Sequence, residues 1–249
     1  RSDTDDLQFT NNTRIVGTYD FVHIRTLLGT EPDGVGALSK DYFPALENED
    51  MRAELRAFLK RYHERKSPGV IDWEQLQPFI EVPHSPKHYR QPVHRHGTHV
   101  AGIIGADWRT TDEEVGLPGP REDLQGVCPA IEIYDLRVLD DDGFGNEFAI
   151  MSAMQFVRDL NNRRDFVAIH GVNLSLSIPH DVANYACGRT PVCEEAERLV
   201  GNGVVVVAAA GNSGRARYMT PSNEIDDGFR TVSITDPGNA DSVITVGAT

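Results

Sequence analysis

Residues 94–106 of this sequence read His-Arg-His-Gly-Thr-His-Val-Ala-Gly-Ile-Ile-Gly-Ala and predict a helix whose start carries chemistry. Small residues recur four apart at Gly97, Ala101 and Gly105, and on a helix they form one smooth ridge that another backbone can approach closely. A helix that begins at Gly97 places His96 at its N-terminus. The partial positive charge there disfavours a protonated imidazole, so the ring stays neutral and can accept a proton as a general base.

The same histidines allow two other interpretations. His94, His96 and His99 form an H-x-H-x-x-H cluster that is similar to the H-x-H-x-D-H metal-binding pattern of metallo-β-lactamases, with Thr98 where that pattern has Asp. The further ligands that such a site needs are not evident in the sequence. The third interpretation is a helix start with incidental histidines.

Four short apolar segments bounded by breakers predict buried strands, at residues 131–139, 172–176, 204–209 and 243–246. Helical patterns separate them, at about residues 146–160 and 192–200. Strands that alternate with helices imply right-handed crossovers, so we expect an α/β fold with a mostly parallel sheet.

Six segments in chain order resemble signatures of the subtilisin-like serine proteases, the subtilases. Residues 96–102 read H-G-T-H-V-A-G, residues 126–130 G-V-C-P-A, and residues 136–145 L-R-V-L-D-D-D-G-F-G. Residues 172–177 read V-N-L-S-L-S, residues 206–212 V-V-A-A-A-G-N, and residues 243–248 V-I-T-V-G-A after Asp236-Pro237. The resemblance covers about residues 14–21 and 92–249, and it implies the family's three-layer α/β/α sandwich.

The resemblance also implies roles for individual residues in a serine endopeptidase. His96 falls on the catalytic base of an Asp-His-Ser triad, and Asn212 falls on the donor that stabilises the oxyanion. The substrate would lie as an extended strand between two edges of the protein. The implied substrate-binding residues are Gly143, Phe144 and Gly145 on one edge, Ser175, Leu176 and Ser177 on the other, and Ala209, Ala210 and Gly211 on the wall of the primary specificity pocket. By local pattern alone, residues 143–145 also fit a glycine-rich turn, and Asn212 fits a turn residue with a left-handed backbone.

The sequence departs from the family pattern at this pocket and in the triad. Ser177 and Ile178 stand where subtilases usually have two glycines, so we expect a narrow pocket that takes small or medium apolar residues. The family's G-T-S-M-A motif occurs nowhere in the 249 residues, so we expect the serine nucleophile to lie outside them. Asp3 only superficially resembles the aspartate motif, and we expect the catalytic Asp upstream of Arg1. The 249 residues alone are therefore expected to be inactive. The competing class is a subtilase-fold module that binds peptides without cutting them.

Residues 23–92 break the strand–helix rhythm with a stretch rich in charge and proline, whose clearest element is a helix at about residues 48–63. We interpret residues 1–249 as part of one subtilase catalytic domain with a surface insertion at about 23–92. A second polar surface loop is expected at residues 107–124. Cys187 and Cys193 could close a small loop through a disulfide worth ~2.4 kcal/mol, or they could remain free thiols.

The charge balance excludes several function classes. There are 24 Lys+Arg and 38 Asp+Glu, and the net charge of −14 disfavours binding to nucleic acid or to an anionic membrane. The longest apolar run, residues 204–210, is too short to span a bilayer. We expect a polypeptide substrate, flanking segments of the same parent protein as partners, and no cofactor. The structural calcium of many subtilases stays open without assigned ligands, because Asp140, Asp141 and Asp142 fit a solvated turn better than a metal loop. The family favours secretion, and a cytoplasmic location is left open.

Overall fold

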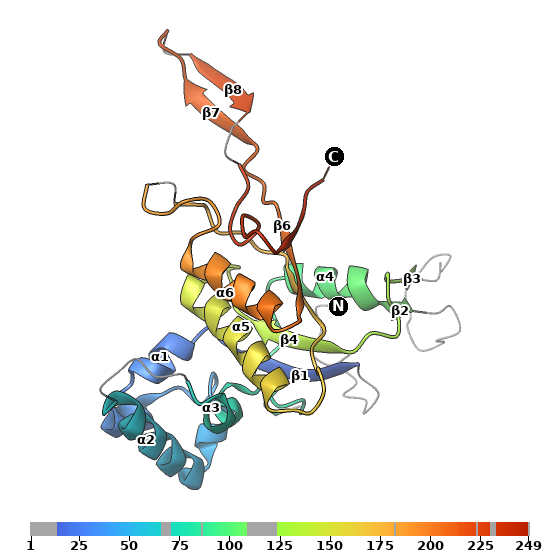
Figure 1. Ribbon diagram of the computed structural model, residues 1–249. Coiled ribbons are helices and arrows are strands. Elements are labelled where there is room, and N and C mark those ends of the chain that lie inside the picture. The colour runs from blue at the N-terminus through green and yellow to red at the C-terminus, as the bar shows by residue number, and fades with distance from the viewer. Residues whose placement is uncertain are drawn as a thin grey trace. The chain divides into compact units, whose positions relative to one another are not determined.

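The computed structural model describes residues 14–65, 71–85, 87–108, 124–181, 183–222, 224–229 and 233–248. These residues fall into two compact units, 1–146 and 147–249, which are described separately (Figure 1). Within the described residues, no helix is long and apolar enough to cross a membrane.

The first unit is built on a parallel pair of strands, β1 (Ile15–Asp20) and β4 (Ile133–Arg137), with Tyr19 opposite Leu136. Glu81 forms an antiparallel bridge with Tyr19 on the same strand. This unit also contains α4 (His96–Gly105) and a short antiparallel ladder between β2 (Asp107–Trp108) and β3 (Leu124–Gln125). The polar loop expected at residues 107–124 lies mostly outside the described residues, since 109–123 are not among them.

Residues 23–82 of this unit form a helical cluster with a hydrophobic core of its own. The helices are α1 (Ile24–Gly29), the 3₁₀ helices η2 (Pro32–Ala37) and η3 (Pro44–Glu47), α2 (Glu49–His63) and α3 (Trp73–Ile80). Asn48 caps α2 by accepting a hydrogen bond from the Asp50 N–H, as expected of an N-cap side chain. The largest fully buried side chains of the cluster are Ile24, Leu27, Leu46, Leu55, Leu59, Trp73, Leu76, Phe79 and Ile80.

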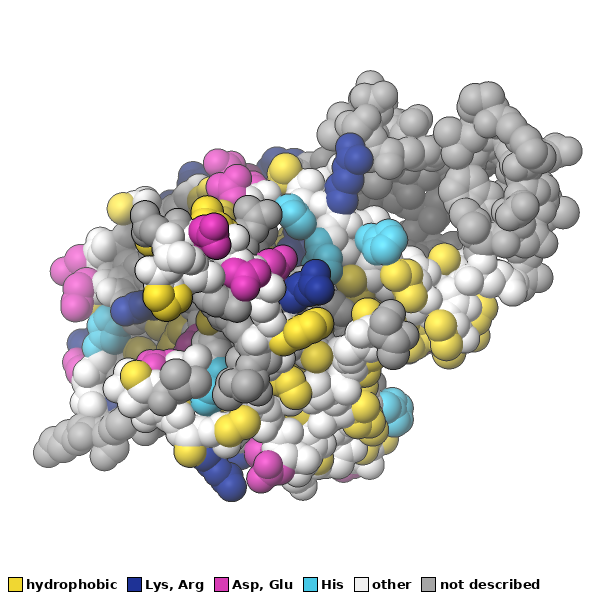
Figure 2. All heavy atoms as spheres, turned by 90° about the horizontal axis from the view of Figure 1, so that it is seen from above, with side chains coloured by type: hydrophobic (Ala, Val, Ile, Leu, Met, Phe, Trp, Pro, Cys, Tyr) yellow, Lys and Arg dark blue, Asp and Glu magenta, His cyan; other side chains and the backbone are white. Residues whose placement is uncertain are grey.

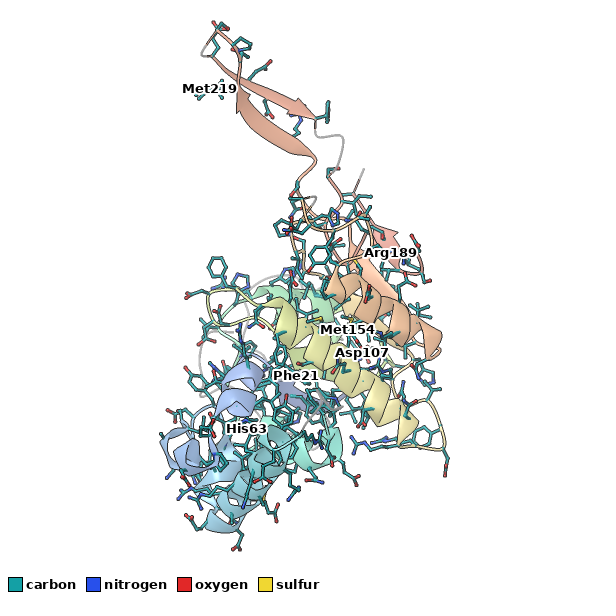
Figure 3. The ribbon with its side chains drawn as sticks, turned by 60° about the vertical axis from the view of Figure 1, so that its left-hand side comes forward. Phe21, His63, Asp107, Met154, Arg189 and Met219 are labelled. Atoms are coloured by element: carbon teal, nitrogen blue, oxygen red, sulfur yellow. The ribbon has the colours of Figure 1, made fainter. Side chains whose placement is uncertain are left out.

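An aromatic contact joins this cluster to β1. Phe21, the residue after the strand, is fully buried (it is labelled in Figure 3). Its ring meets Trp73 edge to face, with ring centroids 5.9 Å apart. The Val82 N–H donates to the Thr18 carbonyl at 2.9 Å. The cluster therefore continues the packing of β1 through shared apolar and backbone contacts.

The second unit holds a parallel three-stranded sheet in the order β5 (Gly171–Leu174), β6 (Val205–Ala209), β9 (Ile244–Val246). Helices α5 (Glu147–Asn162) and α6 (Pro191–Gly201) pack side by side, and α6 contacts β6 (Figure 1). The predicted apolar stripe of α5 is buried: Ile150, Ala153, Met154, Val157 and Leu160.

A β-hairpin that the sequence did not predict follows β6 in the second unit. Strands β7 (Arg215–Met219) and β8 (Ile225–Phe229) pair antiparallel, and the hairpin extends away from the parallel sheet of this unit (Figures 1 and 3). Met219 is 69% exposed and Phe229 82% exposed.

The parallel strands and packed helices confirm the α/β class that the alternating sequence pattern predicts. Each of the four expected strands is present, shortened by one to four residues or shifted by one at its start. The expected helices at 48–63, 146–160 and 192–200 correspond to α2, α5 and α6.

Candidate functional site

His96 is the first residue of α4, one position before the predicted helix start, and its side chain is exposed. The backbone N–H of His96 lies 3.4 Å from His94 Nδ1, and the two imidazole centroids are 6.3 Å apart. His99, one turn further along, is also exposed. Histidine side chains are open to solvent on the face drawn in Figure 2. His96 therefore lies at a helix start, and its side chain is open to solvent.

Two charged contacts hold the segment that leads into His96. Arg90 pairs with Asp20, whose side chain is 5% exposed at the end of β1, and its guanidinium lies 4.8 Å from the centre of the Tyr42 ring. The backbone carbonyl of Arg90 accepts a hydrogen bond from Arg137 at the end of β4. Both strands of the first unit's sheet thus fix the approach to α4.

The other end of α4 is capped by the segment that resembles the family's G-V-A-P turn. The N–H groups of Gly126, Val127 and Cys128 donate to carbonyls of the last turn and C-cap of α4, at 2.7, 3.0 and 2.8 Å. These bonds satisfy carbonyls that a helix terminus leaves without partners. A Cβ on Gly126 would lie 2.6 Å from the backbone nitrogens of Gly105 and Ala106.

Of the predicted ridge of small residues at Gly97, Ala101 and Gly105, only the C-terminal end packs closely against other parts of the chain. A Cβ on Gly105 would meet the Ile131 side chain at 2.7 Å, which requires glycine there. A Cβ on Gly97 would meet nothing within 4 Å among the described residues. The close backbone approach occurs at the C-terminal end of the helix, against Gly126.

The turn at residues 140–145 is held by the side chain of its first residue. Asp140 Oδ1 accepts hydrogen bonds from the Asp142 and Phe144 N–H groups at 3.1 and 2.8 Å, and the Asp140 N–H donates to the Phe144 carbonyl. Gly143 has φ +82°, a left-handed backbone that favours glycine. Phe144 is 73% exposed. The acidic run is thus a self-bonded turn that presents the Phe144 ring to solvent.

The two glycines of this turn have different causes. A Cβ on Gly145 would lie 2.5 Å from the Val138 carbonyl oxygen, a backbone atom just after β4, so this position requires glycine. A Cβ on Gly143 would lie 3.3 Å from the His94 ring, which a small side-chain shift relieves, and the left-handed backbone is what favours glycine there. The contact between His94 and this turn was not predicted from the sequence.

In the second unit, the predicted pocket walls are joined through residues 234–239. Ser175, Leu176 and Ser177 follow the end of β5, and Ala209, Ala210 and Gly211 end and follow β6. The N–H and hydroxyl of Thr235 both donate to the Ala210 carbonyl, at 3.1 and 3.3 Å. The backbone of Asp236 pairs with Ile178 in both directions, at 2.9 and 3.0 Å. One short segment therefore contacts both predicted walls.

Asn212 is exposed immediately after this wall. The left-handed residue of the turn is Gly211, with φ +86°, and a Cβ there would lie 2.3 Å from Thr235 Oγ1. Gly211 supplies the left-handed conformation of this turn, so that conformation is not what explains the asparagine at position 212.

The described histidines and carboxylates do not gather into a group of metal ligands. No group of three or more His, Cys, Asp or Glu side chains in the described part of the chain is arranged to hold a metal ion, and this includes His94, His96 and His99. Asp140 is engaged by the amides of its own turn. Asp3, which the sequence analysis compared with the aspartate motif of the triad, lies outside the described residues.

The cysteines are free thiols, so the disulfide interpretation of Cys187 and Cys193 is not supported. Cys128 and Cys187 are exposed, whereas Cys193 is buried in α6. Burial raises the pKa of the Cys193 thiol to about 12, an effect only partly offset by hydrogen bonds with Thr190.

The sequence did not predict the buried polar cluster around Asp236, formed with His180, Thr190, Cys193 and Asn239. Its members are spread over 60 residues, and no local pattern links them. The one available signal was the Asp236-Pro237 pair within a segment that resembles the family.

Comparisons with known proteins give the family of this chain. The model of the "Subtilase family" matches residues 63–249. Subtilisin DY from Bacillus licheniformis is 31% identical over 160 residues, which cover 64% of this chain and 45% of that protein. Subtilisin BL from Lederbergia lenta is 34% identical over 127 residues, 51% of this chain and 38% of that protein.

Among solved structures, Sphericase is similar with a TM-score of 0.44 and 24% identity, covering 61% of this chain and 39% of that one. The chain spans less than half the length of these relatives. Because the family model matches well over half of the 249 residues, the chain belongs to the subtilase family.

Proposed function

We propose that this chain is part of the catalytic domain of a subtilisin-like serine endopeptidase. In this proposal His96 is the general base and Asn212 donates its amide to the oxyanion. The substrate binds as an extended strand, and residues 143–145 and residues 175–177 are each proposed to contact it. The observation that carries the proposal is that His96 begins α4 with an exposed side chain, on a segment held by both strands of its sheet.

The chemistry follows from these positions. His96 takes the proton of a serine hydroxyl as that oxygen attacks the scissile carbonyl, and later gives the proton to the leaving amine. The Asn212 amide donates a hydrogen bond to the carbonyl oxygen as negative charge develops on it. This stabilises the transition state and the tetrahedral intermediate. An acyl-enzyme forms and water releases it.

The serine and the aspartate of the triad are proposed to come from outside these 249 residues, because no G-T-S motif occurs within them. The 249-residue chain alone should then hydrolyse peptides too slowly to detect. The primary pocket should favour a small or medium apolar residue before the scissile bond, since Ser177 and Ile178 carry side chains where glycines would leave room.

The test uses the full-length protein and a series of fluorogenic peptides that differ before the scissile bond. His96→Ala should lower kcat by about 10⁶-fold, and Asn212→Ala by about 10²–10³-fold, magnitudes that were measured on subtilisin itself. His170→Ala, a change at an exposed histidine of the second unit, is the matched control and should retain full activity.

Two results would contradict the proposal. Activity that survives His96→Ala would remove the assigned base. Tight peptide binding by the full-length wild type, with no cleavage and no labelling by a serine-directed phosphonate, would show the non-catalytic peptide-binding module instead.

A further inference from the structure

His180 and Asp236 form a buried pair beside the predicted specificity pocket. Their side chains are 5% and 1% exposed, and His180 Nδ1 lies 2.9 Å from Asp236 Oδ2. Because an ionised carboxylate only accepts hydrogen bonds, the ring nitrogen is the donor. His180 is thus committed to Asp236 rather than to solvent.

A second side chain bonds the same carboxylate. Asn239 Nδ2 donates to Asp236 Oδ1 at 2.8 Å and also to the Ile234 carbonyl at 3.0 Å. Burial alone would raise the pKa of Asp236, but hydrogen bonds, those from His180 and Asn239 foremost, outweigh it and hold the pKa below its usual range. The carboxylate therefore stays ionised inside the protein, with a side-chain donor on each oxygen.

The backbone of Asp236 and its neighbour connects this cluster to both pocket walls. Asp236 exchanges two hydrogen bonds with Ile178, the residue that follows the wall at 175–177. Thr235 bonds twice to Ala210 in the opposite wall. A shift of Asp236 would carry Ile178 with it and change the distance between the walls.

We propose that His180 is a positioning residue for substrate binding: by holding Asp236 in place, it fixes Ile178 and hence the width of the primary specificity pocket. This inference rests on the proposed function for its catalytic consequence, but the mechanical link between His180 and Ile178 stands on the contacts alone. Removing the His180 donor leaves a buried carboxylate short of a partner, and such a group moves toward water or another donor.

The mechanical link is tested by amide hydrogen exchange on the full-length protein, followed by mass spectrometry of peptides covering residues 174–181 and 233–240. His180→Phe keeps a ring of similar size and removes the donor, and it should speed exchange of the Ile178 and Asp236 amides at least tenfold. His180→Asn keeps a donor near the Nδ1 position and should restore most of the protection. His170→Phe, at an exposed histidine, is the control and should change neither peptide.

The catalytic consequence is tested with the peptide series. For His180→Phe we expect the preference in kcat/KM for Ala over Phe before the scissile bond to fall about tenfold, mainly through KM, while kcat changes less than threefold. His180→Asn should restore the preference. A role in stability alone would lower the melting temperature and leave this preference unchanged.

The inference is overturned if the Ile178 amide of His180→Phe exchanges its hydrogen as slowly as in the wild type. It is also overturned if the Ile178 amide exchanges faster but the preference for Ala over Phe before the scissile bond does not change. If the wild type cleaves no peptide, the proposed function fails, and the exchange measurement still decides the link between His180 and Ile178. If His180→Phe does not fold, Asn239→Ala removes a second donor of the same carboxylate and is measured with the same expectations.

Discussion

Glu195 of α6 lies 2.6 Å from Arg158 of α5, and its own side chain is only 2% exposed. Arg198, one turn along α6, approaches the other carboxylate oxygen at 3.0 Å. The two helices that cover the second unit are thus joined by a buried negative charge between two arginines. A buried charge is tolerated only while its partners remain, so this contact holds α5 and α6 in register.

Neutralising Glu195 should destabilise the second unit. Glu195→Gln removes the counter-charge of Arg158, whose side chain is 25% exposed and so partly solvated, and we expect a loss of about 2 kcal/mol. Glu194→Gln is the matched control, because Glu194 is 51% exposed and its pairing with Arg198 should be worth less than about 1 kcal/mol. Urea unfolding of both variants gives the comparison, and equal losses would contradict the assignment of Glu195.

Gly126→Ala should disrupt the cap of α4. The new Cβ would meet two backbone nitrogens at 2.6 Å, and backbone cannot move aside as a flexible side chain can. We expect a loss of about 3 kcal/mol, within the range for a cap and packing defect. Gly201→Ala, at the end of α6, meets nothing within 4 Å among the described residues and should be neutral or stabilising by up to about 1 kcal/mol. In thermal melts, Gly126→Ala should lower the melting temperature, whereas Gly201→Ala should leave it unchanged or raise it.

The three cysteines should differ sharply in reactivity. At about pH 8, a thiol reagent should modify the exposed Cys128 and Cys187 within minutes and leave Cys193 unmodified until the protein unfolds. Burial both blocks access to Cys193 and keeps it protonated. Peptide mapping by mass spectrometry identifies the sites. Rapid labelling of Cys193 in the native protein would show that the start of α6 opens.

The raised pKa of Cys193 also predicts a loss of stability at alkaline pH. The folded protein keeps this thiol protonated up to about pH 12, whereas the unfolded chain ionises it from its ordinary value of 9.0 upward. The protonated thiol therefore contributes fully to the free energy of unfolding below pH 9.0. This contribution is lost as the pH rises from 9.0 to about 12. Cys193→Ala should show a shallower fall in the free energy of unfolding from pH 9.0 upward. Parallel slopes for wild type and variant would contradict this.

The spacing of apolar residues along the chain predicted the individual helices and strands, because this spacing is set by the local backbone conformation. The apolar stripe of α5 and the short β-branched run of β6 specify a helix and a buried strand wherever they occur, and both were found within a few residues. The spacing of Gly97, Ala101 and Gly105 likewise predicted a helix with His96 at its N-terminus, and α4 begins at His96. That residues 23–92 form a surface insertion stays a prediction. The hydrophobic core within this segment was not predicted from the sequence.

Long-range pairings were not predictable. Nothing near Phe21 indicates Trp73, and nothing near His180 indicates Asp236, because each contact depends on how distant segments pack. The hairpin at 215–229 was missed because Asp226 and Asp227 in β8 and Arg215 in β7 read as loop. Strand pairing within an exposed hairpin does not require the alternation of apolar and polar residues that marks a buried sheet.

The turn at residues 140–145 has a consequence for how this protein can change. Position 144 takes part in the turn only through its backbone, whose N–H and carbonyl both bond to Asp140, while the Phe144 ring is 73% exposed. The ring can therefore be exchanged for other side chains over evolutionary time while the turn keeps its hydrogen bonds, and proline, which has no N–H to donate, is the exception. A protein engineer has the same freedom at this one position, at little risk to folding.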